Sequence, residues 1–334
     1  GLNYENNIQV PMINILAFFT FYFFSRVKLL HIKEIPIVRN GLIYGVSICS
    51  IFVLYLVLNY FKSGVTLNIN FLKVYEFRAE NASLTSGGIL TYINIWTYKI
   101  FNITLICIAL LYNKHRFSVL FFLVQVYFFA ASAHKSVLFM ALLVLSIWWF
   151  FRRSNSLVLL PISLIFLILT SLFIYFYTGD ITMASIFIRR LLNIPAQLGY
   201  IYHDFFSDNS HVYWSDTLLK GFIEYPYESR VSHVIGEYMG KPGMGANNGL
   251  VSSGYAHAGV FGVIVYSFLF SCITRLIEYL QGDEFPNWFV LAVFIVPISS
   301  AILNSDLITT LSTHGLFMAI LTFFFIRTKK RTYN

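Results

Sequence analysis

Apolar runs separated by short polar segments extend along almost the whole chain. Nine of these runs approach the roughly 20 residues that a helix needs to cross the hydrocarbon core of a bilayer. They cover residues 8–25, 38–61, 90–112, 117–133, 137–151, 157–177, 258–280, 287–303 and 311–326. The pattern predicts an all-α fold: a polytopic transmembrane helix bundle in which residues 1–334 form a single membrane domain.

The composition indicates the same class of protein. The chain is 57% hydrophobic and 19% aromatic, only 11% of its residues are charged, and its mean hydropathy is +0.70, which excludes an ordinary soluble domain. The net charge of +8 comes mostly from short basic clusters between apolar runs, so it indicates membrane topology and not nucleic-acid binding. The three cysteines lie in apolar runs without motif spacing, and they predict neither a disulfide framework nor a metal site.

Lysines and arginines gather in alternate connections, at residues 26–39, 114–116, 152–153 and 327–331. By the positive-inside rule these connections are expected to be cytoplasmic. The long segment 180–257 and the shorter segment 62–89 are then extracytoplasmic loops. Nine spans place residue 1 outside, and the chain starts at Gly1, so we expect at least one further helix upstream.

Two basic features lie within or between the spans. Residues 132–136 join the fourth and fifth spans in a tight hairpin whose tip carries His134 and Lys135. The tip either points into an outer cavity or reaches toward the lipid headgroups. Lys99 lies well inside the third span, where a charged group is costly, so we expect it to face a polar cavity.

The loop 62–89 carries Glu76, Arg78 and Glu80. In a helix the two glutamates share one face and Arg78 lies off it, a pattern that an interfacial segment with solvated charges also produces. Arg78 is a candidate anion contact, because the outer loops hold few arginines and guanidinium pairs well with anionic groups.

The long loop 180–257 holds most of the candidate chemistry. Residues 181–201 have helical periodicity, with Arg189 and Arg190 between the apolar positions. The pair is either a membrane-surface anchor or a phosphate clamp, because guanidinium grips phosphate with two parallel hydrogen bonds. Adjacent helical positions diverge by about 100°, so we expect one of the two, preferably Arg190, to face a cavity.

A second stretch of this loop, residues 228–239, gains a polar face if it is helical. Arg230, His233 and Glu237 then share one face, which suits proton transfer beside a cation, although a solvated, ion-paired face has the same pattern. His203 and Asp204 are another candidate for a general base, but the side chains of sequence neighbours rarely hydrogen-bond each other. No His or Cys cluster has metal-ligand spacing.

Two parts of the sequence carry a resemblance to a known family. The first comprises residues 187–195, 202–209 and 213–215; the second comprises residues 234–238, 246–250, 254–259 and 262. Their order, and their position after a long outer loop, resemble the O-antigen polymerase (Wzy-type) family, the oligosaccharide repeat-unit polymerases of bacterial surface polysaccharides. The resemblance covers about the second half of the chain, with weaker support from residues 75–78.

The resemblance implies a GT-C-type membrane glycosyltransferase that works without a metal or cofactor. Its substrate would be an undecaprenyl-pyrophosphate-linked oligosaccharide, polymerised at the outer face of the bacterial inner membrane, with a chain-length regulator and a flippase as candidate partners. The catalytic residues expected on this basis are Glu237, His233 and Arg190. The expected contacts to pyrophosphate or sugar are Arg78, Arg189, Arg230, His203, Asn247, Asn248 and Tyr213.

Two alternatives stay open beside the polymerase. The chain is also similar to the O-antigen ligases, which tend to carry a His-Asn pair where this chain has Asn247 and Asn248. A transporter, for instance a flippase for the same lipid-linked sugars, would place ionisable residues at mid-membrane. Here most of the charge lies in loops, which favours the polymerase.

Overall fold

A computed structural model describes residues 8–27, 35–70, 74–85, 87–152 and 158–327. Within these residues the chain is all-helical and contains no strand, which confirms the predicted secondary-structure class. The basic residues Lys28, Lys33 and Arg153 and the cluster 329–331, on which the predicted orientation partly depends, lie outside the described residues.

Helices occupy each of the nine predicted stretches. Their bounds are α1 (Gln9–Arg26), α2 (Gly41–Lys62), α4 (Ile89–Trp96) continued by η1 (Thr97–Phe101) and α5 (Asn102–Leu111), α6 (His115–Ser132), α7 (Lys135–Phe151), α8 (Leu159–Thr178), α12 (Leu250–Gln281), α13 (Asn287–Leu303) and α15 (Leu316–Ile326). The connections contain α3 (Val74–Thr85), α9 (Thr182–Ala184), η2 (Ser185–Asn193), α10 (Ile194–Asp208), α11 (Val231–Tyr238) and α14 (Leu307–Ser312).

Five of the described helical segments are long and apolar enough to cross a membrane, namely α2, the continuous helix 89–111, α6, α8 and α12. Three more, α7, α13 and α15, are apolar but shorter. The side chains of α8 are mostly exposed, including the large apolar Phe166, Phe173 and Phe176. Exposing such a continuous apolar surface to water is unfavourable, so these helices indicate a membrane-embedded protein.

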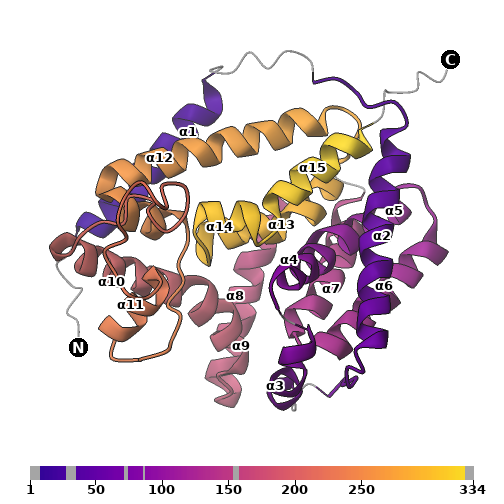
Figure 1. The fold of residues 1–334 in the computed structure, drawn as a ribbon, viewed down its shortest axis with the longest axis horizontal. Coiled ribbons are helices and arrows are strands. Elements are labelled where there is room, and N and C mark those ends of the chain that lie inside the picture. The colour runs from indigo at the N-terminus through magenta and orange to yellow at the C-terminus, as the bar shows by residue number, and fades with distance from the viewer. Residues whose placement is uncertain (1–7, 28–34, 71–73, 86, 153–157, 328–334) are drawn as a thin grey trace. The chain divides into compact units, whose positions relative to one another are not determined.

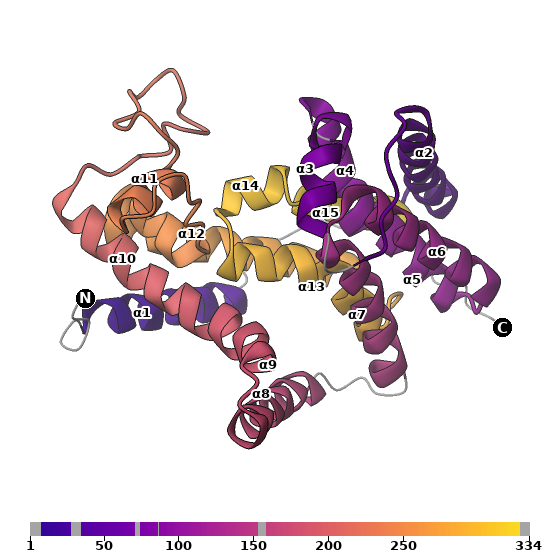
Figure 2. The ribbon, with the colours of Figure 1, turned by 90° about the horizontal axis from the view of Figure 1, so that it is seen from below.

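The chain folds into two compact units. The first comprises Gly1–His31, Val158–Leu276 and Ser299–Thr309, and the second comprises Ile32–Leu157, Ile277–Ile298 and Thr310–Asn334. In the first unit α1 packs against α12 (Figure 1), with ring centroids 4.8 Å apart between Phe24 and Phe268. Helix α10 also contacts α1 (Figure 2).

Helix α12 bends at Ala258 and Gly259, where Gly259 has a φ of 57° that other residues rarely adopt. The predicted span 258–280 corresponds to the part of α12 beyond this bend. The first turns, from Leu250 to the bend, are an additional helical segment that the apolar pattern does not reveal.

The long loop is a folded structure with its own core. Helices α9, η2 and α10 run continuously over residues 182–208, which confirms the helical periodicity of residues 181–201. Helix α11 begins at Val231, so Arg230 precedes it as the N-cap, whereas His233 and Glu237 lie on the helix. The core residues of the loop come from α10, α11 and the flanking segments; they are Leu198, Ile201, Tyr202, Phe205, Phe206, Val212, Ile235, Ala246 and Ala256. Because these side chains are packed together, the loop holds its polar residues in fixed positions.

The second unit contains the predicted α6–α7 hairpin, which Gln125 fastens to η1. The buried Gln125 side chain donates hydrogen bonds to the carbonyl oxygens of Tyr98 (3.0 Å) and Val137 (2.9 Å). Both donors of one amide are therefore satisfied by two different helices. These bonds fix the hairpin against the turn of π-helix that carries Lys99.

Candidate functional sites

The second unit contains a pocket of about 450 Å³ whose basic side chains are Arg78, Lys99 and His134. We call it the basic pocket. Its walls come from α3, α4 with η1, and the α6–α7 hairpin. The other described residues that line it are uncharged; they are Thr91, Asn94, Ile95, Tyr98, Ser132, Ser136, Val137 and Met140. No carboxylate is among the described residues that line it.

Arg78 is held at the basic pocket by contacts between α3 and the hairpin. Its Nη2 donates to the carbonyl oxygen of Ala133 at 3.1 Å, at the point where α6 ends. Asn81, almost one turn further along α3, donates to the carbonyl oxygens of Ala131 (3.0 Å) and Thr66 (2.9 Å). Three side-chain bonds thus fix α3, and the guanidinium of Arg78 is anchored beside the pocket.

Lys99 is the second cation of the basic pocket. Its Nζ lies 3.1 Å from Nδ1 of His314, and because an ammonium group has only donors, the imidazole accepts. This contact requires that Nδ1 of His314 carries no hydrogen. Among the described residues Lys99 makes no ion pair with a carboxylate. Lys99 thus faces a polar cavity, as expected.

His134 lies at the hairpin tip and is exposed to the basic pocket. Partial loss of solvent lowers its pKa to about 4, assisted by the positive charges of Arg78 and Lys99. The imidazole is therefore neutral near pH 7. Two cations next to neutral polar groups are suited to an anionic ligand, whose charge would relieve the repulsion between them.

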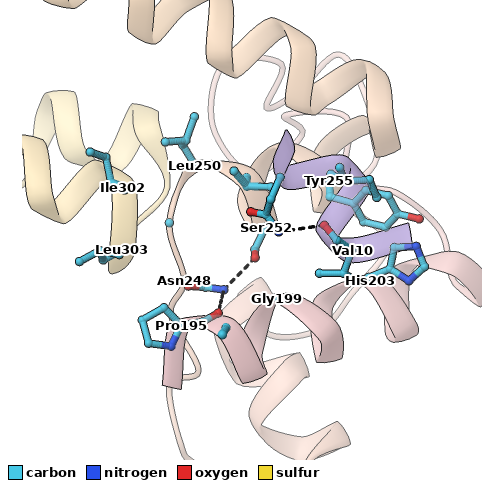
Figure 3. Close-up of a pocket in the computed structure, with 15 residues that line it drawn as sticks. Val10, Pro195, Gly199, His203, Asn248, Leu250, Ser252, Tyr255, Ile302 and Leu303 are labelled. Carbon is cyan, nitrogen blue, oxygen red and sulfur yellow. Dashed lines mark hydrogen bonds between the residues drawn. The ribbon is translucent and has the colours of Figure 1, made fainter. Parts of the chain in front are cut away.

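The first unit contains a second pocket, of about 330 Å³, between α1, α10, the first turns of α12 and the end of α13 (Figure 3). We call it the neutral pocket. Its polar side chains are Asn14, His203, Asn248, Ser252 and Tyr255, and no Lys, Arg, Asp or Glu is among the described residues that line it. The rings of His203 and Tyr255 stack, with centroids 4.9 Å apart.

A cluster around Asp306 lies beside the bend of α12. Asp306 Oδ2 accepts hydrogen bonds from the Tyr266 hydroxyl (2.6 Å) and from Nε2 of the buried His257 (3.3 Å). Burial raises the pKa of Asp306, but the hydrogen bonds from His257 and Tyr266 outweigh it and hold the pKa below its usual range. His257 Nδ1 accepts from the backbone N–H of Trp214 at 3.2 Å. Both imidazole nitrogens are thus used in fixing the loop.

The Asp306 cluster supports the backbone turn that contains Tyr213 and Trp214. Both have positive φ angles, 49° and 56°, which are uncommon outside glycine. The Trp214 ring stacks on His257 at 5.1 Å, and its Nε1 donates to Tyr266 at 3.1 Å. The Asp306 cluster therefore acts as an anchor for the turn 211–215, and Tyr213 itself is exposed.

The structure separates the candidate residues into three groups. Arg78 lines the basic pocket, and His203 and Asn248 line the neutral pocket. His233 is half-buried on α11, outside both pockets. The remaining candidates are exposed and line neither pocket; they are Arg189, Arg190, Tyr213, Arg230, Glu237 and Asn247.

The sequence analysis did not single out Ser252, Tyr255 or Asn14 as pocket residues. The only signal for the first two was their position between Asn248 and the bend of α12, and Asn14 was a lone amide in an apolar run. The described residues contain no group of three or more His, Cys, Asp and Glu side chains that could hold a metal ion.

Comparisons of the chain with protein-family models, with curated proteins and with solved structures found no match. The functional assignment therefore rests on the two pockets and on the resemblance described above.

Proposed function

We propose that this protein is a membrane glycosyltransferase of the GT-C type that polymerises polyprenyl-pyrophosphate-linked oligosaccharide repeat units into a surface polysaccharide. The observation that carries the proposal is the basic pocket, in which Arg78 and Lys99 face one cavity without a lining carboxylate. A chain of apolar helices with such a cavity suits a substrate that has a lipid tail and a pyrophosphate group.

In the proposed reaction a hydroxyl of one repeat unit attacks the anomeric carbon of the growing chain. The bond between that carbon and the pyrophosphate oxygen breaks, the electron pair leaves with the polyprenyl pyrophosphate, and the hydroxyl proton passes to a base. Negative charge grows on the leaving oxygen as the bond breaks. Fixed cations close to that oxygen stabilise this charge in the transition state.

Arg78 and Lys99 are better suited to this role than Arg189 and Arg190. Both members of the adjacent pair are exposed, so water and salt would screen their charge. Arg78 is half-buried and anchored by its bond to Ala133, and Lys99 is half-buried against His314. Charges fixed in a partly buried cavity are screened less by water and interact more strongly with a ligand.

A transporter for the same lipid-linked sugars remains the second candidate, because Lys99 is an ionisable residue within a membrane-spanning helix. The two candidates differ in whether a glycosidic bond forms. Purified protein in sealed proteoliposomes is incubated with lipid-linked repeat units. The products are separated on a gel, and the side of the bilayer on which the substrate lies is measured. We expect a ladder of polymers; movement of the substrate across the bilayer without a ladder would identify a transporter and refute the polymerase.

A further inference from the structure

The neutral pocket contains buried polar groups that the proposed pyrophosphate chemistry does not use. His203 is 7% exposed, Asn248 5% and Ser252 7%, and all three line the pocket. Buried polar groups in proteins are nearly always hydrogen-bonded. The unused hydrogen-bonding capacity of these three side chains therefore indicates which ligand the pocket accepts.

Asn248 presents an acceptor. Its Nδ2 donates to the carbonyl oxygen of Pro195 at 3.1 Å and to Ser252 Oγ at 2.7 Å (Figure 3), so both of its amide hydrogens are used. Its Oδ1 has no partner among the described residues. Ser252 Oγ accepts the bond from Asn248, which leaves its own hydrogen to donate to a ligand.

His203 presents a second acceptor. Ser207 donates its hydroxyl hydrogen to the main-chain oxygen of His203 at 2.7 Å, and its Oγ also lies 3.5 Å from Nδ1. Because the hydroxyl hydrogen is already used, we assign the ring hydrogen to Nδ1, which leaves Nε2 as an acceptor. Burial lowers the pKa of His203, outweighing the opposite effect of Asp204, so the ring is neutral near pH 7.

We propose that the neutral pocket binds one uncharged sugar unit, whose hydroxyl groups pair with His203 Nε2, Asn248 Oδ1 and the Ser252 hydroxyl. A sugar hydroxyl both donates and accepts, which matches two acceptors and one donor on the protein. The stacked rings of His203 and Tyr255 offer an apolar face for the C–H side of the sugar. The volume of about 330 Å³ lies within the range of small-molecule pockets.

Two other occupants fit less well. An anion would find no cationic side chain among the described lining residues. A hydrocarbon chain could not pair with the unused acceptors and donor of His203, Asn248 and Ser252, which is unfavourable. The inference extends the proposed function and does not depend on it, because sugar binding here requires no transfer reaction.

Gly199 offers a direct way to test the pocket. A Cβ at this position would meet its nearest atoms, Val10 Cγ1 and Ser252 Oγ, at 3.8 and 3.9 Å, which are ordinary contacts. Gly199→Ala is therefore a matched control that fits without rearrangement and favours the helix. Gly199→Leu projects a larger side chain toward Val10 and Ser252 and fills the space that the sugar would occupy.

The probes are neutral methyl glycosides of hexoses, deoxyhexoses and N-acetylhexosamines, and binding is measured by saturation-transfer NMR. The full chain is held in phospholipid nanodiscs, because detergents with sugar headgroups would compete. We expect at least one glycoside to bind. Its affinity should fall at least tenfold in Gly199→Leu and in His203→Phe, and should change less than threefold in Gly199→Ala.

Three results would overturn the inference. They are an absence of binding by every glycoside, equal binding by Gly199→Leu and the wild type, and displacement of the glycoside by an alkane. Thermal melting of each variant verifies folding, and Ser252→Ala provides a milder change if Gly199→Leu does not fold. Glycoside binding without a polymer ladder refutes the proposed function alone, whereas a ladder without glycoside binding refutes only this inference.

Discussion

Replacing Arg78 by lysine tests whether the leaving group is stabilised in the basic pocket or by the exposed arginines of the long loop. The substitution keeps a positive charge but removes the planar fork of donors. Arg78 uses Nη2 to hold the carbonyl oxygen of Ala133, and a guanidinium is a planar group whose geometry also matches phosphate. Lysine supplies a single point charge on a flexible stem and cannot make both contacts in a fixed geometry.

The expected loss for Arg78→Lys is that of one preorganised donor, about 2–4 kcal/mol of transition-state stabilisation. At 25 °C this corresponds to a decrease in kcat/KM of roughly 30- to 1,000-fold. Loss of the bond to Ala133 also removes on the order of 1 kcal/mol of stability, which thermal melting would detect as a modest shift. Such a shift leaves the protein folded at the assay temperature, so unfolding does not account for the loss of activity.

Arg190→Lys is the matched comparison, because it makes the same chemical change at an exposed position. We expect its kcat/KM to stay within about threefold of the wild type, since exposed ionic contacts contribute little. The assay is the rate of ladder formation from lipid-linked repeat units at several substrate concentrations. A large defect in Arg190→Lys together with near-normal activity in Arg78→Lys would refute our reasoning and restore the clamp at residues 189–190.

Three further predictions follow from the same geometry. Lys99→Met, which removes the second cation, should reduce ladder formation at least tenfold, and full activity would exclude Lys99 from the site. Sulfate keeps its charge between pH 7 and 5.5, so its affinity for the basic pocket, measured by titration calorimetry, should stay constant there, because His134 gains a proton only as the pH falls toward its pKa of about 4. A rise in affinity centred near pH 6.5 would instead show an ordinary histidine. Gly249→Ala should destabilise the protein by about 1–3 kcal/mol, because the added Cβ would overlap the carbonyl oxygen of Ile302, and an unchanged melting temperature would contradict this packing.

The sequence was sufficient to locate the main helices, because their length and apolarity follow directly from the requirements of a bilayer. It was not sufficient for the first turns of α12, which are rich in Ser, Gly and His and lack the apolar signal. Nor does helical periodicity reveal the π-helical turn that carries Lys99. Such turns widen the helix locally and change the direction of the side chains on it.

The candidate sites were harder to predict than the helices. Lys99 was identified because a charge within an apolar run needs a polar environment, which is a local argument. Its proximity to Arg78 and His134 depends on the packing of α3 against the hairpin, and no spacing in the sequence contains that information. The exposed Arg189 and Arg190 attracted attention through residue type alone, which gives no orientation.

The anchored turn at 211–215 also determines where the chain tolerates variation in length. His257 and Asp306 fix the segment just before residue 216, and the Tyr225 hydroxyl donates to the carbonyl oxygen of Ser229 (2.8 Å) where the chain returns. Residues 216–224 between these points are almost all exposed, with Phe222 88% exposed. Insertions there would lengthen an exposed loop without disturbing α10. Chains of this fold can therefore differ in the length of residues 216–224 while they keep the same neutral pocket.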